Sequence, residues 1–455
     1  MGNSSGELTF NKKLYPPMIL GSILNPINSS MLAIAMIPIA HAFNIPFYQT
    51  ALLVTSLYLA TSIGQPIIGK LIDVFGPKGL FLFATSLVGL ASILAIVTPS
   101  FYGLVLARFL IGIGTCAGYP SSMYLIKYEG ERTGKDSPSN ILTVLAISNQ
   151  TVSVIGPTLG GLLINFGGWK AIFFVNIPLS ILCIIFGVLY FPKVTQSLGK
   201  ITALKTHIDF IGMTFFTITL VTWIIYFTEP SIQNLYLLII GIVTFIIFIF
   251  VELKSKKPFI DVRLLAHNAS LNNTYIRSTL TQTISYSVLY GYTQWLEEGR
   301  GLSPSHAGLL MLPMFIIAIV ASKYTGSTLS SKNKLYVGTL AGIVTMISFT
   351  LINPQTSLII LVLLAALFGI PQGLMNLANQ NALYHQAPKE SIGMSAGLLR
   401  TFMYMGAIIS STANGIFFKG GDITVGIHND GIFCATLGVI ILIMTFANRR
   451  SLAKS

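Results

Sequence analysis

Charged residues are scarce in this chain. Of its 455 residues, 9% are charged and 53% are hydrophobic, and the mean hydropathy is +0.76. A soluble globular domain carries about 25% charged residues, so the composition excludes that class. Apolar runs of about 20 residues, long enough for a hydrocarbon core of about 30 Å, recur from end to end. These runs predict an all-α polytopic membrane protein.

Cysteine is rare as well, and the residue patterns of an enzyme are missing. Cys116, Cys183 and Cys434 all lie within apolar runs, so no disulfide is expected. The sequence contains no nucleophile–base pair, metal-ligand cluster or nucleotide-binding loop. We therefore expect neither a metal nor a cofactor, and predict that the protein is not an enzyme. Residues 1–15 are polar, so no cleavable signal peptide is expected.

Long connections between the apolar runs are also lacking, which leaves no room for a soluble domain. Fourteen membrane-spanning helices are predicted, at residues 17–41, 48–68, 79–98, 102–126, 139–165, 171–192, 208–228, 234–253, 272–297, 304–322, 335–352, 356–384, 392–418 and 431–448. The segment "GKLIDVFGPK" (Gly69–Lys78) follows the second span, and a degraded echo, "TGSTLSSKNK" (Thr325–Lys334), follows the tenth. This repeat predicts two six-helix bundles, 1–192 and 272–455, with two inserted helices and linkers in 193–271.

Acidic residues are few, and the basic residues predict the orientation. The chain has 27 Lys and Arg against 14 Asp and Glu, a net charge of +13. Nearly all the basic residues fall on one face of the predicted topology, and only Lys170, Arg300 and Lys419 fall on the other. The positive-inside rule makes the crowded face cytoplasmic, so a multi-pass plasma-membrane protein with both termini in the cytoplasm is expected. The charge therefore reports topology within a lipid bilayer, and no nucleic acid partner is expected.

Five short motifs follow one another along the chain. They are "GKLIDVFGPK" with Gly69, Asp73, Gly76 and Lys78, "RFLIGIG" (Arg108–Gly114), "GPTLGG" with Gly156, Pro157, Gly160 and Gly161, "GLSPSHAGLLMLP" (Gly301–Pro313) and "GLLRTFMYMGA" (Gly397–Ala407). In this order they resemble the major facilitator superfamily, and within it the fourteen-helix drug:proton antiporters of multidrug efflux. The resemblance implies that "GPTLGG" is the antiporter motif, whose bend separates exporters from importers. From the residues alone, its small side chains also fit a helix-packing groove.

The first motif is expected to act as a conformational latch. Its glycines allow a tight turn, and Asp73 suits either a helix N-terminus or a basic partner. Where the resembled family usually has a basic residue after the acid, this chain has Val74, so a smaller charge network is expected.

Polar residues at helical spacing predict a substrate cavity. Tyr275, Thr279, Gln282, Tyr286, Tyr290, Thr293 and Glu297 form one stripe at about 100° per residue. Tyrosine has a large apolar face and a polar tip, which suits a drug-lined cavity; the alternative is a dry interface between helices. The candidate lining residues are Asn25, Asn28, Ser29, Tyr119, Gln282, Tyr286, Tyr290, Gln372, Asn376 and Arg400.

Ionisable residues inside predicted spans are the candidates for proton coupling, because such groups are costly in lipid. Arg108 is one, with a purely structural arginine as the alternative. Many relatives in the resembled family have an aspartate near Ser29, and this chain has none. Glu297 continues the tyrosine stripe and is predicted to carry the titratable site instead, with exposure at the outer rim as the alternative. Glu298 and Asp209 come next.

The remaining ionisable residues are expected at membrane edges. Arg277 lies one turn from the cytoplasmic end of its span and is expected to extend to the lipid headgroups. The other carboxylates, including Asp430, are expected in loops or at span ends.

Together these features predict a proton-coupled multidrug efflux antiporter that works by alternating access. Amphipathic aromatic drugs or dyes are the expected substrates, and the proton is the expected coupling ion. One alternative is an exporter of an endogenous solute, including an anionic or lipid-like metabolite, because Arg108 and Arg400 outnumber mid-membrane acids. The other is a membrane receptor or scaffold without transport.

Overall fold

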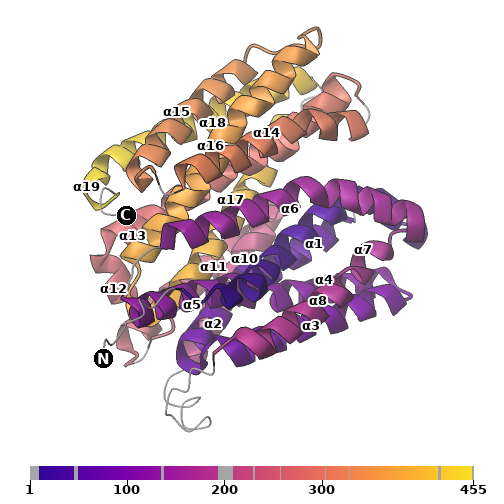
Figure 1. Cartoon of the computed structure of the whole chain (residues 1–455). Coiled ribbons are helices and arrows are strands. Elements are labelled where there is room, and N and C mark those ends of the chain that lie inside the picture. Colours follow the sequence, from indigo (N-terminus) through magenta and orange to yellow (C-terminus); the bar gives the residue numbers. More distant parts are fainter. Residues whose placement is uncertain are drawn as a thin grey trace, which may run out of the picture. The chain divides into compact units, whose positions relative to one another are not determined.

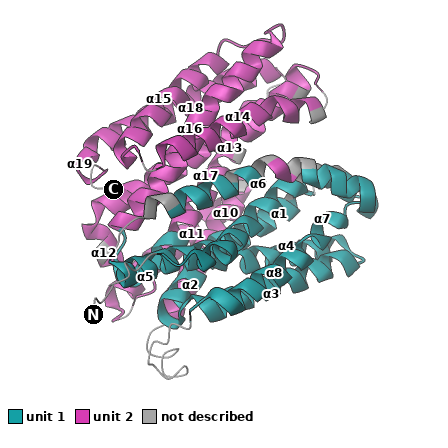
Figure 2. Ribbon diagram, in the orientation of Figure 1, with its two compact units in different colours: residues 1–152, 158–205, 387–397 teal, residues 153–157, 206–386, 398–455 magenta. Residues whose placement is uncertain are grey.

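The computed structural model describes residues 10–45, 50–134, 138–192, 209–228, 231–256, 258–302, 304–326, 328–418 and 422–452. These residues form helices and no strand (Figure 1). Lipid offers no hydrogen bonds to backbone polar groups, so an apolar chain can satisfy them only within helices or a closed barrel. The helices fall into two compact units (Figure 2): residues 1–152, 158–205 and 387–397, and residues 153–157, 206–386 and 398–455.

The first unit is built from the N-terminal helices. They are α1 (Tyr15–Phe43), α2 (Ala51–Phe75), α3 (Pro77–Val97), α4 (Phe101–Gly114), α5 (Gly118–Thr133), most of α6 (Pro138–Gly167), α7 (Ala171–Phe174) and α8 (Asn176–Tyr190). A short 3₁₀ turn, Thr115–Ala117, joins α4 to α5. Helix α1 packs against α5 and α8, and α3 packs against α4 and α8. The approach of α1 to α5 requires glycine, because a Cβ atom on Gly118 would collide with the carbonyl of Gly21.

The second unit holds the remaining helices. They are α10 (Phe210–Thr228), α11 (Leu235–Lys254), α12 (Val262–His267), α13 (Ala269–Ser287), α14 (Pro304–Thr325), α15 (Ser331–Phe349), α16 (Leu358–Gln386), α17 (Ile392–Phe417), α18 (Ile423–Ala447) and α19 (Arg449–Leu452). Helices α14, α15, α16 and α18 surround a large apolar core. Helices α10 and α11 pack against each other. Residues 392–397 of α17 belong to the first unit and the rest to the second.

Two π-helical segments extend α13 toward the chain's next loop. They cover Val288–Tyr292 and Trp295–Gly299. A π turn accommodates one more residue than an α turn, and each extra residue rotates the following side chains by about 100°. The regular α-helical spacing assumed for residues 275–297 is therefore not kept throughout the stretch after Ser287.

The outer surfaces of the helices are apolar. Within the described residues, nine helices are long and apolar enough to cross a membrane. Side chains such as Leu90 on α3, Ile359 on α16 and Ile443 on α18 are more than half exposed. Exposed apolar side chains spread along whole helices indicate contact with lipid. All three cysteines, by contrast, are buried and unpaired.

Helices lie at the positions of the predicted spans, and the number that crosses the membrane stays a prediction. One boundary differs in an important way, because α18 begins at Ile423 instead of residue 431. Asp430 consequently lies inside a helix, and its expected place at a span end is wrong. The predicted three-part division also stays a prediction; the observed compact units group α10 and α11 with the C-terminal helices.

Candidate functional site

Two polar side chains of α1, Asn25 and Asn28, form a buried cluster with polar side chains of other elements in the first unit. We call it the N-terminal polar cluster: Asn25, Asn28, Arg108, Thr115 and Asn176. Asn28 Nδ2 donates to Asn176 Oδ1 at 2.9 Å, and Asn176 Nδ2 donates back to Asn28 Oδ1 at 2.8 Å. Asn25 Nδ2 donates to Thr115 Oγ1 at 3.0 Å. The cluster therefore joins α1 to α8 and to the α4–α5 junction through helix–helix hydrogen bonds, which explains how α1 carries so much polarity.

Arg108 completes this cluster as a buried side chain bonded to backbone carbonyls. It is 1% exposed, and its Nε and Nη1 donate to the carbonyl oxygens of Leu53 and Asn28, both at 3.2 Å. This geometry matches the structural alternative considered for the residue. Two other predicted residues lie nearby in the same unit: Tyr119 is buried, and Ser29 is half-buried with its hydroxyl donating to the Asn25 carbonyl at 3.0 Å.

Two charged residues of the first sequence motif lie on either side of the α2–α3 turn, and each caps the end of another helix. Asp73 Oδ1 accepts from Gly393 N at 2.9 Å and Oδ2 accepts from Met394 N at 2.8 Å, so the carboxylate caps the start of α17. Lys78 Nζ donates to the carbonyls of Val188 and Phe191, at 2.7 and 2.9 Å, at the end of α8. An acid at a helix N-terminus and a base at a C-terminus both complement the helix dipole.

Two glycines of this motif have specific roles. Gly76 has φ of 80°, a conformation that favours glycine, and forms the turn between α2 and α3. A Cβ atom on Gly69 would collide with the carbonyl of Gly393. In the "GPTLGG" motif, a Cβ atom on Gly160 would lie 3.2 Å from the Cα of Met31 on α1, whereas Gly161 faces open space. Gly156 is buried, and the side chain of Pro157 lies outside the described residues.

The tyrosine stripe of α13 divides into a dry end and a more exposed end. The ring of Tyr275 stacks on Phe402 with centroids 5.1 Å apart, and it is 2% exposed. Tyr286 and Tyr290 stack on each other at 5.7 Å, and Tyr290 is 39% exposed. Gln282, which lies between Tyr275 and Tyr286 in the sequence, is half-buried. The alternative of a dry interface therefore applies to Tyr275, while Tyr286 and Tyr290 form an aromatic surface, which we call the tyrosine pair.

The opposite face of α13 carries a polar network that the sequence did not reveal. Arg277 is fully buried, and its Nε donates to Asn379 Oδ1 on α16 at 2.7 Å, while its Nη2 donates to Thr274 Oγ1 at 3.0 Å. The expected extension of Arg277 to lipid headgroups is therefore wrong, because the side chain is buried and binds Thr274 on its own helix and Asn379 on α16. Further along α16, Asn376 donates to the Gln372 carbonyl at 3.2 Å, and both side chains are half-buried.

Asp209 and Glu298, two of the predicted proton-coupling carboxylates, each bind a different neighbouring group. Asp209 accepts from Gly212 N at 2.7 Å and so caps α10. Glu298 is exposed and accepts from Gln294 Nε2 at 3.0 Å. The backbone of Glu297 lies in the second π segment, and its side chain lies outside the described residues. Arg400 is half-buried on α17. Asp430, which sequence reasoning placed at an edge, is 0% exposed within α18.

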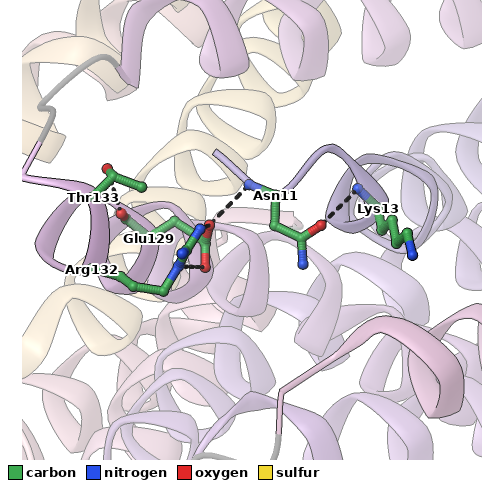
Figure 3. Close-up of polar contacts among 5 residues, drawn as sticks. All are labelled: Asn11, Lys13, Glu129, Arg132 and Thr133. Atoms are coloured by element: carbon green, nitrogen blue, oxygen red, sulfur yellow. Dashed lines mark hydrogen bonds and ion pairs between the residues drawn. The ribbon is translucent and has the colours of Figure 1, made fainter. Parts of the chain in front are cut away.

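A further charged contact ties the start of the chain to the end of α5. Figure 3 shows the Glu129 carboxylate between Asn11 N, which donates to Oε2 at 2.9 Å, and Arg132, which donates to both oxygens at 2.8 and 2.7 Å. The Asn11 side chain accepts in turn from Lys13 N at 3.1 Å. An open pocket of about 680 Å³ lies beside this contact, lined also by Tyr128 and Tyr190.

Comparison with known proteins identifies the family. The chain matches the profile described as Major Facilitator Superfamily over residues 18–411. It belongs to this superfamily. The chain is 35% identical over 434 residues to "Uncharacterized MFS-type transporter YwoD" of Bacillus subtilis, covering 93% of this chain and 92% of the relative.

More distant relatives carry functional names. "Riboflavin transporter RibZ" of Clostridioides difficile is 23% identical, over 88% of this chain and 86% of its own length. "Multidrug efflux pump SdrM" of Staphylococcus aureus is 23% identical, over 95% of this chain and 96% of its own length. These matches indicate a multi-pass membrane transporter of small molecules and not an enzyme.

The fold agrees with this assignment. The crystal structure of the human organic anion transporter MFSD10 (TETRAN) superimposes with a TM-score of 0.68, over 95% of this chain and 99% of that chain. The sequence identity is 12%, so the likeness concerns the fold alone. The predicted all-helical architecture of a major facilitator transporter is thus confirmed.

Proposed function

We propose that this transporter is a proton-coupled antiporter that exports amphipathic aromatic compounds. The observation that carries the proposal is the tyrosine pair on α13, where Tyr286 and Tyr290 stack and Tyr290 remains 39% exposed. Stacked phenol rings offer a planar apolar surface with polar tips, which suits planar drugs and dyes. The relative named as a multidrug efflux pump supports the same substrate class.

The proposal includes fourteen membrane spans, cytoplasmic termini and alternating access at the plasma membrane. The crowding of basic residues on one face supports that orientation. We assign the conformational latch to Asp73, because its carboxylate holds the first backbone N–H groups of α17. A helix held at its N-terminus by a releasable charge provides a two-state element.

Proton coupling completes the proposal. A proton carrier in a membrane is a carboxyl group that the two sides reach in turn. From the sequence, Glu297 is the first candidate, with Glu298 and Asp209 behind it. Arg108 is assigned a supporting role in the N-terminal unit, since its side chain already binds two backbone carbonyls.

The test is export from the cytoplasmic side in inside-out vesicles, with and without a pH gradient, across a panel of cationic, neutral and anionic aromatic compounds. Gradient-driven transport of planar aromatic cations and neutral dyes is the expected result. Tyr290→Ala should weaken dye binding, whereas Tyr236→Ala removes a tyrosine that is 56% exposed on α11 and should not. Glu297→Gln tests the first coupling candidate. Absence of any gradient-dependent flux in the wild type would refute the proposal and favour a receptor or scaffold.

A second candidate is export of an endogenous planar solute. It is favoured by the relative named as a riboflavin transporter, because an isoalloxazine ring is a planar aromatic system that the tyrosine pair could stack against. The same vesicle panel separates the two, since a dedicated exporter moves one planar solute and ignores the dyes.

A further inference from the structure

Asp430 is a carboxyl group enclosed within the second unit. It is the eighth residue of α18 and is 0% exposed. At about 1.5 Å per residue it lies about 11 Å along a helix that is long and apolar enough to cross a hydrocarbon core of about 30 Å. It therefore has the position of a membrane-embedded acid that the sequence had not revealed.

The side chains that lie around the Asp430 carboxyl and bond to it are uncharged. With the Asn414 amide oriented so that its nitrogen faces α18, Asn414 Nδ2 donates to Asp430 Oδ1 at 3.1 Å, and Asn414 Oδ1 accepts from Gly291 N at 3.2 Å. The thiol of Cys434, one turn along α18, donates to the same Oδ1 at 3.7 Å. The Ser287 hydroxyl on α13 lies beside the carboxyl. Three helices thus converge on one acid.

Across the described residues, no basic side chain forms an ion pair with Asp430. The end of α15 that packs on this part of α18, with its capping residue, presents the Met346 carbonyl, the Phe349 side chain and the Thr350 methyl group to Gly431, and none of these is a charged group. The neighbouring histidine, His428, is directed to the carbonyl of Ile352 at 2.8 Å. Tyr292 on the π segment donates its hydroxyl to the Leu361 carbonyl at 3.0 Å. A buried carboxylate without a counter-charge is costly, and taking up a proton would remove its charge.

One oxygen of the carboxyl is left for that proton. Asp430 Oδ2 is buried and has no hydrogen-bond partner among the described residues. It lies against Gly291, where an added Cβ atom would be 3.2 Å from it. Gly291 lies in the first π-helical segment of α13, and π turns inside helices occur frequently at functional sites. The widened turn and the glycine leave space at the oxygen that would carry the proton.

A chain of hydroxyls leads away from this acid. Ser287 Oγ lies 3.1 Å from Ser410 Oγ on α17, and both side chains are buried. Hydroxyl groups donate and accept, so they can pass a proton onward. The Ser287–Ser410 pair therefore joins α13, whose Ser287 lies near the carboxyl, to α17, the helix whose first residues are held by Asp73.

We propose that Asp430 is a proton-binding site of the transport cycle, loaded at Oδ2 in one conformational state and emptied in another. This assignment rests on the proposed proton-coupled function. In the loading step an O–H bond forms at Oδ2 while one O–H bond of a hydronium ion breaks and leaves water. On release the Oδ2–H bond breaks and the proton returns to a water molecule. While no proton is bound, Asn414 and Cys434 stabilise the charged carboxylate by donating hydrogen bonds to Oδ1.

The experiment uses the full-length protein and the variant Asp430→Asn, which keeps the shape and hydrogen-bonding capacity of the side chain but cannot titrate. Asp422→Asn is the matched control, because Asp422 caps the same helix from an exposed position and Asn also caps helices well. Gradient-driven dye export should fall at least about tenfold in Asp430→Asn, with dye affinity nearly unchanged, as expected for a residue that acts in turnover and not in binding. Asp422→Asn should transport normally.

A second measurement reads protonation directly in the wild type. Infrared difference spectroscopy between about pH 5 and about pH 9 should show a protonated carboxyl band that titrates in this range and disappears in Asp430→Asn. A hydrophobic carbodiimide, which attacks protonated buried carboxyls, should label the peptide containing Asp430 in a pH-dependent way. Mass spectrometry of the wild type gives this result even if the variant does not fold.

The outcomes separate the two proposals. Full gradient-driven export by Asp430→Asn, or a carboxyl band that does not change with pH, overturns the assignment of Asp430 while leaving the antiporter proposal intact. Absence of gradient-dependent transport in the wild type refutes the antiporter, and the infrared titration then shows separately whether Asp430 binds a proton. Loss of coupling in Asp430→Asn together with a titrating band supports both.

Discussion

Replacing Asp73 by Asn tests the latch at the start of α17. The carboxylate accepts two backbone hydrogen bonds, from Gly393 at 2.9 Å and Met394 at 2.8 Å. Asparagine keeps one accepting oxygen and replaces the other with a donor, which cannot bond to a backbone N–H. The substitution therefore removes one charge-assisted hydrogen bond and the negative charge, while the side chain keeps its shape.

The magnitude follows from these two losses. A hydrogen bond to a charged group contributes about 1.5–3 kcal/mol, and a charge at a helix N-terminus contributes about 0.3–1 kcal/mol. Burying a neutral amide is easier than burying a carboxylate, which offsets part of the sum and leaves about 2 kcal/mol. At about 1.4 kcal/mol per tenfold change, the latched state becomes about 25-fold less populated relative to its alternatives.

The assay measures turnover and binding separately. In proteoliposomes, Asp73→Asn should lower the rate of dye export by up to about 25-fold, because a required state is depleted. Its equilibrium affinity for the dye, measured by fluorescence titration in detergent, should change little. Asp422→Asn is again a suitable control, since Asp422 accepts its two backbone N–H bonds, from Thr424 and Val425, at the single oxygen Oδ1, which asparagine keeps, and caps its own helix in an exposed place.

The reverse pattern would refute this reasoning. If Asp73→Asn exported dye at the normal rate while its affinity fell strongly, the carboxylate would belong to the binding site and not to a latch. Equal losses in Asp73→Asn and Asp422→Asn would show that the effect comes from weakened helix capping in general.

Three further predictions concern the polar clusters and the tyrosine pair. Asn28→Leu should lower the free energy of unfolding by about 1–3 kcal/mol, because it leaves the buried Asn176 amide without its partner; the double variant with Asn176→Leu should regain much of this in a reversible unfolding assay, and an additive loss would contradict the pairing. Arg277→Lys should lower the thermal midpoint, because lysine lacks the fork that reaches both Asn379 and Thr274; an unchanged midpoint would show that the buried contacts contribute little. Tyr290→Ala should weaken binding of aromatic dyes by about 0.5–1.5 kcal/mol while Tyr290→Phe retains it, as read by fluorescence titration; equal weakening by both would assign the effect to the hydroxyl.

The helices themselves could be predicted from apolar runs, because a membrane span must be both long and apolar. The end of the chain shows where this reasoning fails. His428, Asn429, Asp430 and Gly431 look like a loop, since these residue types favour turns. In the structure they lie in the second and third turns of α18, and Asp430 is buried. The capping residue Asp422, followed by Ile423 and Thr424, was the signal that would have placed the helix start correctly.

The site could be predicted only in part, because burial depends on partners far away in the sequence. Spacing correctly grouped Tyr286 with Tyr290, which stack. It had no means of showing that Asn28 meets Asn176, or that Arg277 meets Asn379, since these pairs are 148 and 102 residues apart. The π segments of α13 were equally hidden, because a π turn is set by the packing around the helix and has no distinctive composition.

The enclosure of the three cysteines has a practical consequence for studying motion. Cys116, Cys183 and Cys434 are each 0% exposed in the structure, and buried thiols are largely inert toward reagents in water. The natural chain is therefore a near-silent background for site-directed thiol chemistry. A single cysteine introduced on the surface can be labelled with a fluorophore or spin probe while the native thiols stay in place, so the protein's movements can be followed without first replacing residues that pack its core.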